Sequence, residues 1–398
     1  MKKLMLLGGA QYLLPVIKEA HALGLYVITC DYLPDNIAHK YADEYCNVSI
    51  IDKDAVLEAA QELRIDGIMS FACDPGVVTA AYVAEKMGLS FAGSYEAVSI
   101  LQNKGRFRAF LRDNGFNVPW AKSYTDPAEA LRDAVSYSWP MIVKPTDSAG
   151  SKGVSRVDSL EELKAAIDFA LAFSHGGEFI VEQFIQQQGS SSDSDSFSVD
   201  GELCFCSFDE QLFDPDAENP YTPAAYIWPS SMPDEIQAEL RSELQRLMKL
   251  LGLKSSVYNI ETRMGTDGKA YIMELSPRGG GNRLSEVLEM ATGTRLISNA
   301  VRAAVGMETE PMTDPEYKGH WAELILHSDR DGKFKKLWIE PALESSVAQI
   351  DLWVNEGDAV ERFSGANKAI GTLVMNFADR ALLEECMKSH DWYKVIVE

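Results

Sequence analysis

The stretch NIETRMGTDGKAYIMELSPR, residues 259–278, decides the fold of this chain. Two strand-like runs flank the Asp-Gly pair at 267–268, which is the strongest short signal for a β-hairpin. With that pair at the centre of the turn, Glu261 lies directly opposite Glu274. Like charges placed opposite each other destabilise a strand pair unless something compensates them. The hairpin therefore predicts either a cation held between the two acids or a solvated face on which they pair with a neighbour such as Arg263.

An arginine and three glycines directly after the hairpin favour the bound cation. Arg278 is an anion-binding group, and the run Gly279–Gly281 lets the backbone approach a ligand closely. Mg²⁺ takes one or two carboxylates and completes its shell with water and phosphate oxygens. We therefore expect Glu261 and Glu274 to hold Mg²⁺ beside a bound phosphate.

Two lysines and a loop of small residues precede the hairpin in the chain. Lys144 ends the apolar run WPMIVKP, and the loop DSAGSKG follows at 147–153. Serines and glycines at this density offer N–H groups and hydroxyls to phosphate oxygens, although many such loops are only flexible connections. Lys144 is costly on a buried strand without an anionic partner. Lys104 begins a predicted helix, where it opposes the helix dipole unless an anion binds there.

The first hundred residues alternate short strands and helices. Runs such as KLMLLGG, LYVITC and DGIMSFA read as strands, with helical segments between them. This alternation predicts βαβ units, a parallel sheet and helices on both of its faces. The apolar start of the chain is interpreted as the first strand and not as a signal peptide, because glycines interrupt it early.

Two later segments have a different character. QQQGSSSDSDS, residues 186–196, is polar and low in complexity, and we interpret it as a mobile loop. A hairpin around Asp200-Gly201 follows. Residues 311–398 contain short strand-like runs and a final helix. The expected fold class is a multidomain α/β and α+β protein.

Taken together, these motifs resemble the ATP-grasp ligases, in the branch of carbamoyl-phosphate synthase and the smaller carboxylate–amine ligases. The resemblance covers residues 103–306, where the two lysines, the small-residue loop, the run VEQFI at 181–185 and the hairpin stand in the family's order. It implies a pre-ATP-grasp domain over 1–102, an ATP-grasp domain of two subdomains over 103–310 and a small β-rich carboxyl-terminal domain over 311–398.

The resemblance also implies the roles of individual residues. The phosphates would be contacted by Lys104 and Lys144 and covered by the loop residues Ser148, Gly150, Ser151, Lys152 and Gly153. Adenine would lie against the hinge residues Glu182, Gln183, Phe184 and Ile185, with Glu182 accepting from its amino group. The metal ligands would be Glu261, Glu274 and Ser276. Arg278 would be the catalytic residue that steadies the transferred phosphoryl group.

The chain departs from the family pattern at two of these positions. Ser276 stands where the family usually has Asn, and its hydroxyl offers a shorter oxygen ligand. Asn259, which faces Ser276 in the predicted hairpin, is a candidate to substitute in part. The acid that normally holds the ribose hydroxyls follows the hinge, and here Asp195 in the low-complexity segment is the candidate.

The implied cofactors are ATP and Mg²⁺, or Mn²⁺ in its place. The implied reaction activates a small-molecule carboxylate as an acyl phosphate, which an amine then attacks with release of ADP and phosphate. Two alternatives stay open: a bicarbonate-using carboxylase or carbamoyl-phosphate-type enzyme, and a non-catalytic nucleotide-binding protein. Arg283, after the glycines, is a candidate to bind a second carboxylate.

Charge and composition limit the possible partners. Asp and Glu total 60 against 37 Lys and Arg, a net charge of −23, which argues against attraction to nucleic acid or anionic membranes. No apolar run is long enough to span a bilayer. The six cysteines have no metal-site or disulfide spacing, so we expect reduced thiols in a cytoplasmic protein. Related enzymes suggest a homodimer.

Overall fold

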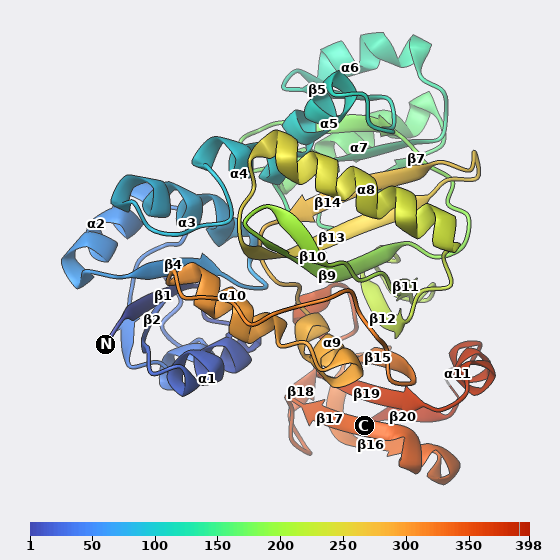
Figure 1. Ribbon diagram of the computed structural model, residues 1–398. Helices are drawn as coiled ribbons and strands as arrows, with labels where there is room; N and C mark the ends of the chain where they lie inside the picture. The colour runs from blue at the N-terminus through green and yellow to red at the C-terminus, as the bar shows by residue number, and fades with distance from the viewer. Residues whose placement is uncertain (390) are drawn as a thin grey trace.

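The computed structural model describes residues 1–389 and 391–398, and Figure 1 shows their arrangement. The amino-terminal part, blue in Figure 1, is a parallel sheet of order β3-β2-β1-β4, which confirms the predicted βαβ units. Its strands are β1 (Lys3–Leu7), β2 (Tyr26–Cys30), β3 (Glu44–Cys46) and β4 (Gly67–Ser70). Its helices are α1 (Leu14–Ala22), α2 (Lys53–Leu63) and α3 (Asp74–Met87). Gly8 follows the first strand, and Asp74 opens α3 after β4.

The small subdomain that follows is an antiparallel sheet of order β5-β8-β6-β7. Its strands are β5 (Ala121–Tyr124), β6 (Met141–Pro145), β7 (Ser155–Val157) and β8 (Phe179–Gln183). The helices of this region are α4 (Tyr95–Gln102), α5 (Lys104–Asp113), α6 (Pro127–Asp133) and α7 (Leu160–Ala172). Val143 and Val181 from the sheet pack with Ile167 of α7 in one core. The outer end of β6 thereby places Lys144 beside the loop that leads to β7.

A second antiparallel sheet, of order β10-β9-β13-β14, carries the hairpin. Its strands are β9 (Ser192–Val199), β10 (Glu202–Phe205), β13 (Ser256–Met264) and β14 (Ala270–Ser276), and helix α8 (Asp234–Leu251) packs on it. The prediction of a mobile loop over 186–196 is therefore wrong for residues 192–196, because they belong to β9, which lies between β10 and β13 in the sheet. Ser194 and Ser196 are fully buried there. The polar sequence of this segment therefore gave no sign that it forms a buried strand.

The hairpin pairs Glu261 with Glu274 and Asn259 with Ser276, as predicted. The turn is longer than expected, because β13 ends at residue 264 and β14 begins at residue 270. An irregularity beside Glu261 then leaves Met273 as an extra residue in β14 and restores the predicted register. The carbonyl of the bulged Met273 accepts a hydrogen bond of 2.7 Å from Arg108 Nη1. The bulge is thus tied to α5.

The third sheet, of order β11-β12-β15-β19-β17, joins distant parts of the chain. Its strands are β11 (Glu210–Phe213), β12 (Pro223–Trp228), β15 (His320–Leu326), β17 (Val347–Leu352) and β19 (Gly371–Phe377). It therefore spans the domain boundary expected between residues 310 and 311. A smaller sheet contains β16 (Gly332–Ile339), β18 (Ala359–Val360) and β20 (Tyr393–Val397), and α11 (Arg380–Met387) lies nearby.

Helices α9 (Leu284–Thr292) and α10 (Leu296–Ala304) connect the second sheet to the rest of the molecule. Helix α10, orange in Figure 1, packs against α1 and β4 of the amino-terminal part. Contact is close enough that a Cβ at Gly67 would lie 2.4 Å from the carbonyl of Ala304. The short 3₁₀ helices are Gln11–Leu13, Ile37–Lys40, Ala134–Ser136, Pro341–Ser346 and Ala366–Lys368. Across the part of the chain described, no helix has both the length and the apolar character that crossing a bilayer requires.

Candidate active site

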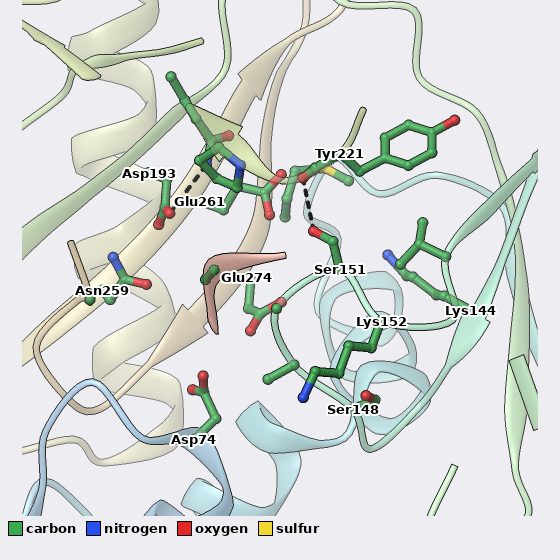
Figure 2. Close-up of a pocket in the computed structure, with 18 of the residues that line it drawn as sticks. Asp74, Lys144, Ser148, Ser151, Lys152, Asp193, Tyr221, Asn259, Glu261 and Glu274 are labelled. Carbon is green, nitrogen blue, oxygen red and sulfur yellow. Dashed lines mark hydrogen bonds between the residues drawn. The ribbon is translucent and has the colours of Figure 1, made fainter. Parts of the chain in front are cut away.

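A cavity of 350 Å³ lies between the amino-terminal part, the small subdomain, the second sheet and the third sheet. Figure 2 shows its wall, with the acids of β13 and β14 on one side and β6 and its following loop on the other. Most of the residues expected at a nucleotide site line it: Lys104, Lys144, Ser148, Gly150, Ser151, Lys152, Glu182, Phe184, Glu261, Glu274 and Arg278. The structure therefore brings together residues that are up to 174 positions apart in the chain, as the resemblance implied.

The two acids of the hairpin are partly exposed to the cavity, and the chain supplies a cation to each. Arg263 Nη2 donates to Glu261 Oε1 at 2.8 Å. Lys104 Nζ lies 3.6 Å from Glu274 Oε2. The side chains of Glu261 and Glu274 remain 27% and 33% exposed. The pairing that we left open for Arg263 is thus present, and both carboxylates still face the cavity.

Oxygen donors at this wall fit a hard divalent cation. Among residues 1–389 and 391–398, however, no group of three or more His, Cys, Asp and Glu side chains is close enough to hold a metal by itself. A Mg²⁺ ion at Glu261 and Glu274 would therefore need phosphate and water oxygens to complete its shell. That requirement suits a metal that arrives with a nucleotide.

Lys144 is held by a buried ionic network. Glu182 accepts from Lys144 Nζ and, at 3.0 Å, from Arg108 Nε. Burial alone raises the pKa of Glu182, but the charges of Arg108 and Lys144 outweigh it and lower that pKa to about 2. The carboxylate is thus fully engaged, and it fixes the ammonium of Lys144 at the cavity wall. The contact of Glu182 with adenine stays a prediction.

The small-residue loop lies across the cavity and is anchored on both sides. The carbonyl of Ser148 accepts from Lys104 Nζ at 2.8 Å, and Ser151 Oγ donates to the carbonyl of Tyr221 at 2.9 Å. Gly150, Ser151 and Gly153 have φ angles of 67°, 57° and 72°, a left-handed backbone that favours glycine. The loop thereby links β6 to the segment before β12.

Arg278 binds a partner that the sequence did not reveal. Its guanidinium donates to both carboxylate oxygens of Asp74, at 2.9 and 2.7 Å, and to Asn259 Oδ1 at 2.9 Å. Burial raises the pKa of Asp74, but the charge and hydrogen bonds of Arg278 and a bond from Ser276 outweigh it and lower that pKa. Asp74 opens α3 at the carboxyl edge of the parallel sheet, where ligands of such sheets collect. That position is the signal that could have indicated it.

Ser276 and Asp195 have other environments than expected. Ser276 Oγ donates to Asp74 and accepts from Gln102 Nε2, both at 2.9 Å, so this hydroxyl is already engaged. Asp195 is fully buried in β9, where it accepts from the amide of Gly280 at 2.8 Å and from Ser285 Oγ. The placement of Asp195 in a loop near the ribose is therefore wrong. Ser276, Asp195 and the expected residues Gly153, Gln183 and Ile185 are absent from the cavity wall among the residues described.

The strand that replaces the expected loop contributes an acid of its own. Asp193 lies opposite Glu261, which lies opposite Glu274, so three carboxylates form a row across β9, β13 and β14. Asp193 lines the cavity. Burial, Asp209 and Glu261 raise the pKa of Asp193 well above its usual range. Sequence reasoning missed this residue because it treated its strand as a loop.

Comparison with known proteins agrees with this geometry. Residues 137–286 match the family model described as the ATP-grasp domain. The formate-dependent phosphoribosylglycinamide formyltransferase of Parasynechococcus marenigrum is 31% identical over 194 residues, which are 46% of this chain and 48% of that protein. The chain thus spans about half the length of the first curated relatives it matches.

Two solved structures share the fold. The L-amino acid ligase of Bacillus licheniformis has a TM-score of 0.81 at 20% identity, over 100% of this chain and 99% of that one. The biotin carboxylase domain of the Hydrogenobacter thermophilus 2-oxoglutarate carboxylase, a dimer with MgADP, ADP and bicarbonate, has a TM-score of 0.74 at 17% identity, over 100% and 91%. The chain contains an ATP-grasp domain, as its motifs predicted. Its relatives include an ATP-grasp enzyme of Aspergillus fumigatus, 27% identical over 54% of this chain and 38% of that protein.

Proposed function

We propose that this protein is an ATP- and Mg²⁺-dependent ligase that activates a carboxylate as an acyl phosphate for attack by an amine. One observation carries the proposal: the paired acids Glu261 and Glu274 share a single cavity with Lys104, Lys144 and the small-residue loop. A phosphate-binding wall facing a pair of carboxylates is the arrangement that phosphoryl transfer from a metal-bound nucleotide requires.

The residues present suit each part of that chemistry. Bound Mg-ATP supplies the phosphoryl group and neutralises part of its charge. Lys104 and Lys144 hold positive charge where phosphate oxygens would lie, and their positions are fixed by the loop and by Glu182. Closure of the loop over a bound nucleotide would exclude water, which would otherwise hydrolyse an acyl phosphate. Arg278 lies beside the acids, oriented by Asp74, and steadies the transferred group.

The relatives support a ligase, although the first curated ones match only about half of this chain. An L-amino acid ligase has the same fold over the whole chain, and a biotin carboxylase domain of this fold binds MgADP. On that basis we propose that this chain also binds ATP and Mg²⁺ and forms a carbon–nitrogen bond. The partners are then a small-molecule carboxylate and amine.

Cellular setting and assembly belong to the same proposal. All six cysteines are free, which suits a reducing compartment such as the cytoplasm. A neighbour of the same fold is a dimer in its crystal structure, and we propose a homodimer here.

A screen for ADP release with Mg-ATP tests the function. Pairs drawn from amino acids, small organic acids and bicarbonate are offered to the whole protein. We expect ADP release that depends on both a carboxylate and an amine. Release with bicarbonate in place of an organic acid would indicate a carboxylase instead. Tight ATP binding without turnover across the panel would contradict the ligase and leave a nucleotide-binding protein.

A further inference from the structure

A row of polar side chains lies on the inner face of the third sheet, away from the lysines. Gln211, Tyr226 and Glu323 are direct neighbours on β11, β12 and β15, so their side chains point to the same face. Gln211 and Tyr226 line the cavity, and Glu323 is the next residue of the row. Trp321 and Ile325 flank Glu323 on that face and belong to the core that reaches the amino-terminal part. Glu323 therefore points toward the cavity side of the sheet.

Glu323 is a buried acid that the chain leaves unbound. It is 0% exposed, and neither carboxylate oxygen has a hydrogen-bond partner within residues 1–389 and 391–398. An ionised carboxylate in such a place costs several kcal/mol unless a cation or hydrogen bonds compensate it. The chain thus contains a buried carboxyl group that is free to bind a positively charged or donating ligand.

The charges around Glu323 are mostly negative. We call Asp209, Glu286, Glu323 and Asp351, with Arg283, the acid-rich end; none of these five residues lines the cavity itself. Arg283 opposes these acids, but Glu286 binds its guanidinium at 2.9 and 3.1 Å and Asp351 lies 3.9 Å from it. Burial raises the pKa of Glu323 well above its usual range. Arg283 lowers this pKa, whereas Glu286 and Asp209 raise it further. Among the residues that the structure describes, no cation donates a hydrogen bond to Glu323.

A chain of hydrogen bonds runs along the cavity wall to Tyr226, the residue next to Glu323 in the row. Tyr12 donates to Asn282 Oδ1 at 3.0 Å, and Asn282 Nδ2 donates to the hydroxyl of Tyr226 at 3.3 Å. All three residues line the cavity. Asn282 stands in the left-handed region, with φ of 52°, at the end of the glycine run. These neutral groups are exchangeable for the donors of a ligand at little cost, because each bond that is lost has a replacement.

We infer that Glu323 binds a protonated amino group of the substrate once the side chain of Asn282 moves aside, so that the protein takes an amino acid or another ammonium-bearing compound. The inference rests on the proposed function, because it concerns the second substrate of the same cavity. An ammonium group provides the charge and the donors that Glu323 lacks. A phosphorylated ligand, by contrast, would meet carboxylates that repel it. Glu323 is thereby the residue that determines the substrate class.

Two measurements on the whole protein test this inference. The first is the shift of the thermal midpoint, without nucleotide, on adding each standard amino acid, its analogue without the amino group, or ribose 5-phosphate. The second is ADP release with Mg-ATP over the same compounds. The variant is Glu323→Gln, which keeps the shape and removes the charge. The control is Glu356→Gln, an exposed acid of the same part of the chain.

We expect some amino acids to raise the thermal midpoint, with no rise from their deaminated analogues or from ribose 5-phosphate. Glu323→Gln abolishes that rise and increases KM for the amino acid about 10- to 100-fold, with KM for ATP unchanged, as for loss of a charged hydrogen bond. The variant stays folded, since Gln keeps the size of Glu323 and adds no charge to this buried position. Glu356→Gln behaves as the parent protein.

An equal response to deaminated compounds, or an unchanged KM in Glu323→Gln, overturns the inference and leaves ADP release, hence the proposed function, intact. Failure of the proposed function has a different appearance, since then no compound releases ADP. The thermal shift still decides the inference in that case. A rise that Glu323→Gln abolishes supports it, and the absence of any rise with amino acids contradicts it.

Discussion

Acidic side chains at the nucleotide end of the cavity and at the acid-rich end have opposite environments. At the nucleotide end, which we define as Lys104, Lys144, Glu182, Glu261 and Glu274, each of the three carboxylates has a cation supplied by the chain. Their neighbour Asp193 accepts a hydrogen bond from the neutral side chain of Gln211. At the acid-rich end, Glu323 is buried without a hydrogen-bond partner among the residues described. Charges that are paired in the free protein keep a site in shape, whereas a charge left unpaired is compensated by a ligand or a proton. The difference indicates that the nucleotide end is preorganised in the free protein, whereas the acid-rich end is completed by its substrate.

Removing an acid from the nucleotide end should have the largest effect. Glu274→Gln takes one of the two facing carboxylates from the proposed metal position. We expect kcat/KM for ADP release to fall about 10³-fold or more, because stabilisation of the transferring phosphoryl group is lost. Thermal unfolding should change little, since Glu274 is partly exposed. Kinetics equal to those of the parent protein would contradict the metal assignment.

Breaking the buried network at the same end should destabilise the fold. Arg108→Met leaves Glu182 with Lys144 alone and frees the carbonyl of Met273. We expect the free energy of unfolding in urea to fall by about 3–5 kcal/mol, the usual effect of breaking a buried ion pair. An exposed ion pair offers the control: Arg106→Gln, which loses only its contact with Glu96, should change it by less than about 1 kcal/mol.

The pH dependence of the same variant sharpens this test. The depressed pKa of Glu182, about 2, contributes stability that is present above its unfolded value near 4 and is lost as pH falls through 2. Without Arg108 that pKa rises, so acid unfolding should begin at a higher pH. An unshifted acid midpoint would show that Lys144 alone compensates Glu182.

At the acid-rich end, removing a charge should instead stabilise. Burial raises the pKa of Asp209 to about 7, and its Oδ2 has no hydrogen-bond partner in the described part of the chain. A raised pKa gives stability that is complete below the unfolded value near 4 and is lost as pH rises through 7. Asp209→Asn should therefore raise stability at pH 8 by about 1–3 kcal/mol and flatten the pH profile between 4 and 7. Lower stability of the variant at pH 8 would reverse the comparison of the two ends.

The smallest effect is expected at the edge of the nucleotide end. Arg263→Gln removes the partner of Glu261, a pair in which both side chains are partly exposed. We expect stability to change by less than about 1 kcal/mol. The Mg²⁺ concentration for half-maximal ADP release should fall about two- to threefold, because Arg263 no longer competes with the metal. A higher Mg²⁺ requirement would show that Arg263 helps to orient Glu261.

Local patterns predicted much of this fold. The βαβ units, the hairpin at Asp200-Gly201 and the pairing of Glu261 with Glu274 depend on short-range signals, and the structure confirms them. The pairing was correct although the turn was not, because a longer turn and a bulge at Met273 offset each other. Periodicity cannot reveal such a bulge, since the hydrogen bond that stabilises it comes from Arg108 in a distant helix.

Long-range features were beyond the sequence. Strand β9 is rich in Ser and Asp, which have low strand propensity, and its pairing with β13 supplies the stability that its residues lack. Glu323 stands in the run HWAELIL, where alternation would put an acid on a solvated face. Both faces of β15 are covered, because Trp321 and Ile325 pack on one side and Ala322 and Leu324 on the other. Only the assembled sheets make that acid buried.

The third sheet has a consequence for the order in which the chain folds. Strand β12, with Tyr226 and Trp228, gains its neighbour β15 only after residue 326 has been synthesised. Until then it is an open sheet edge with apolar side chains, a feature that promotes aggregation. A chain that stopped at residue 310 would contain every residue of the nucleotide end and still be prone to precipitate. The carboxyl-terminal strands thus cover an edge of the part that holds the nucleotide end, and they bring Glu323 with them.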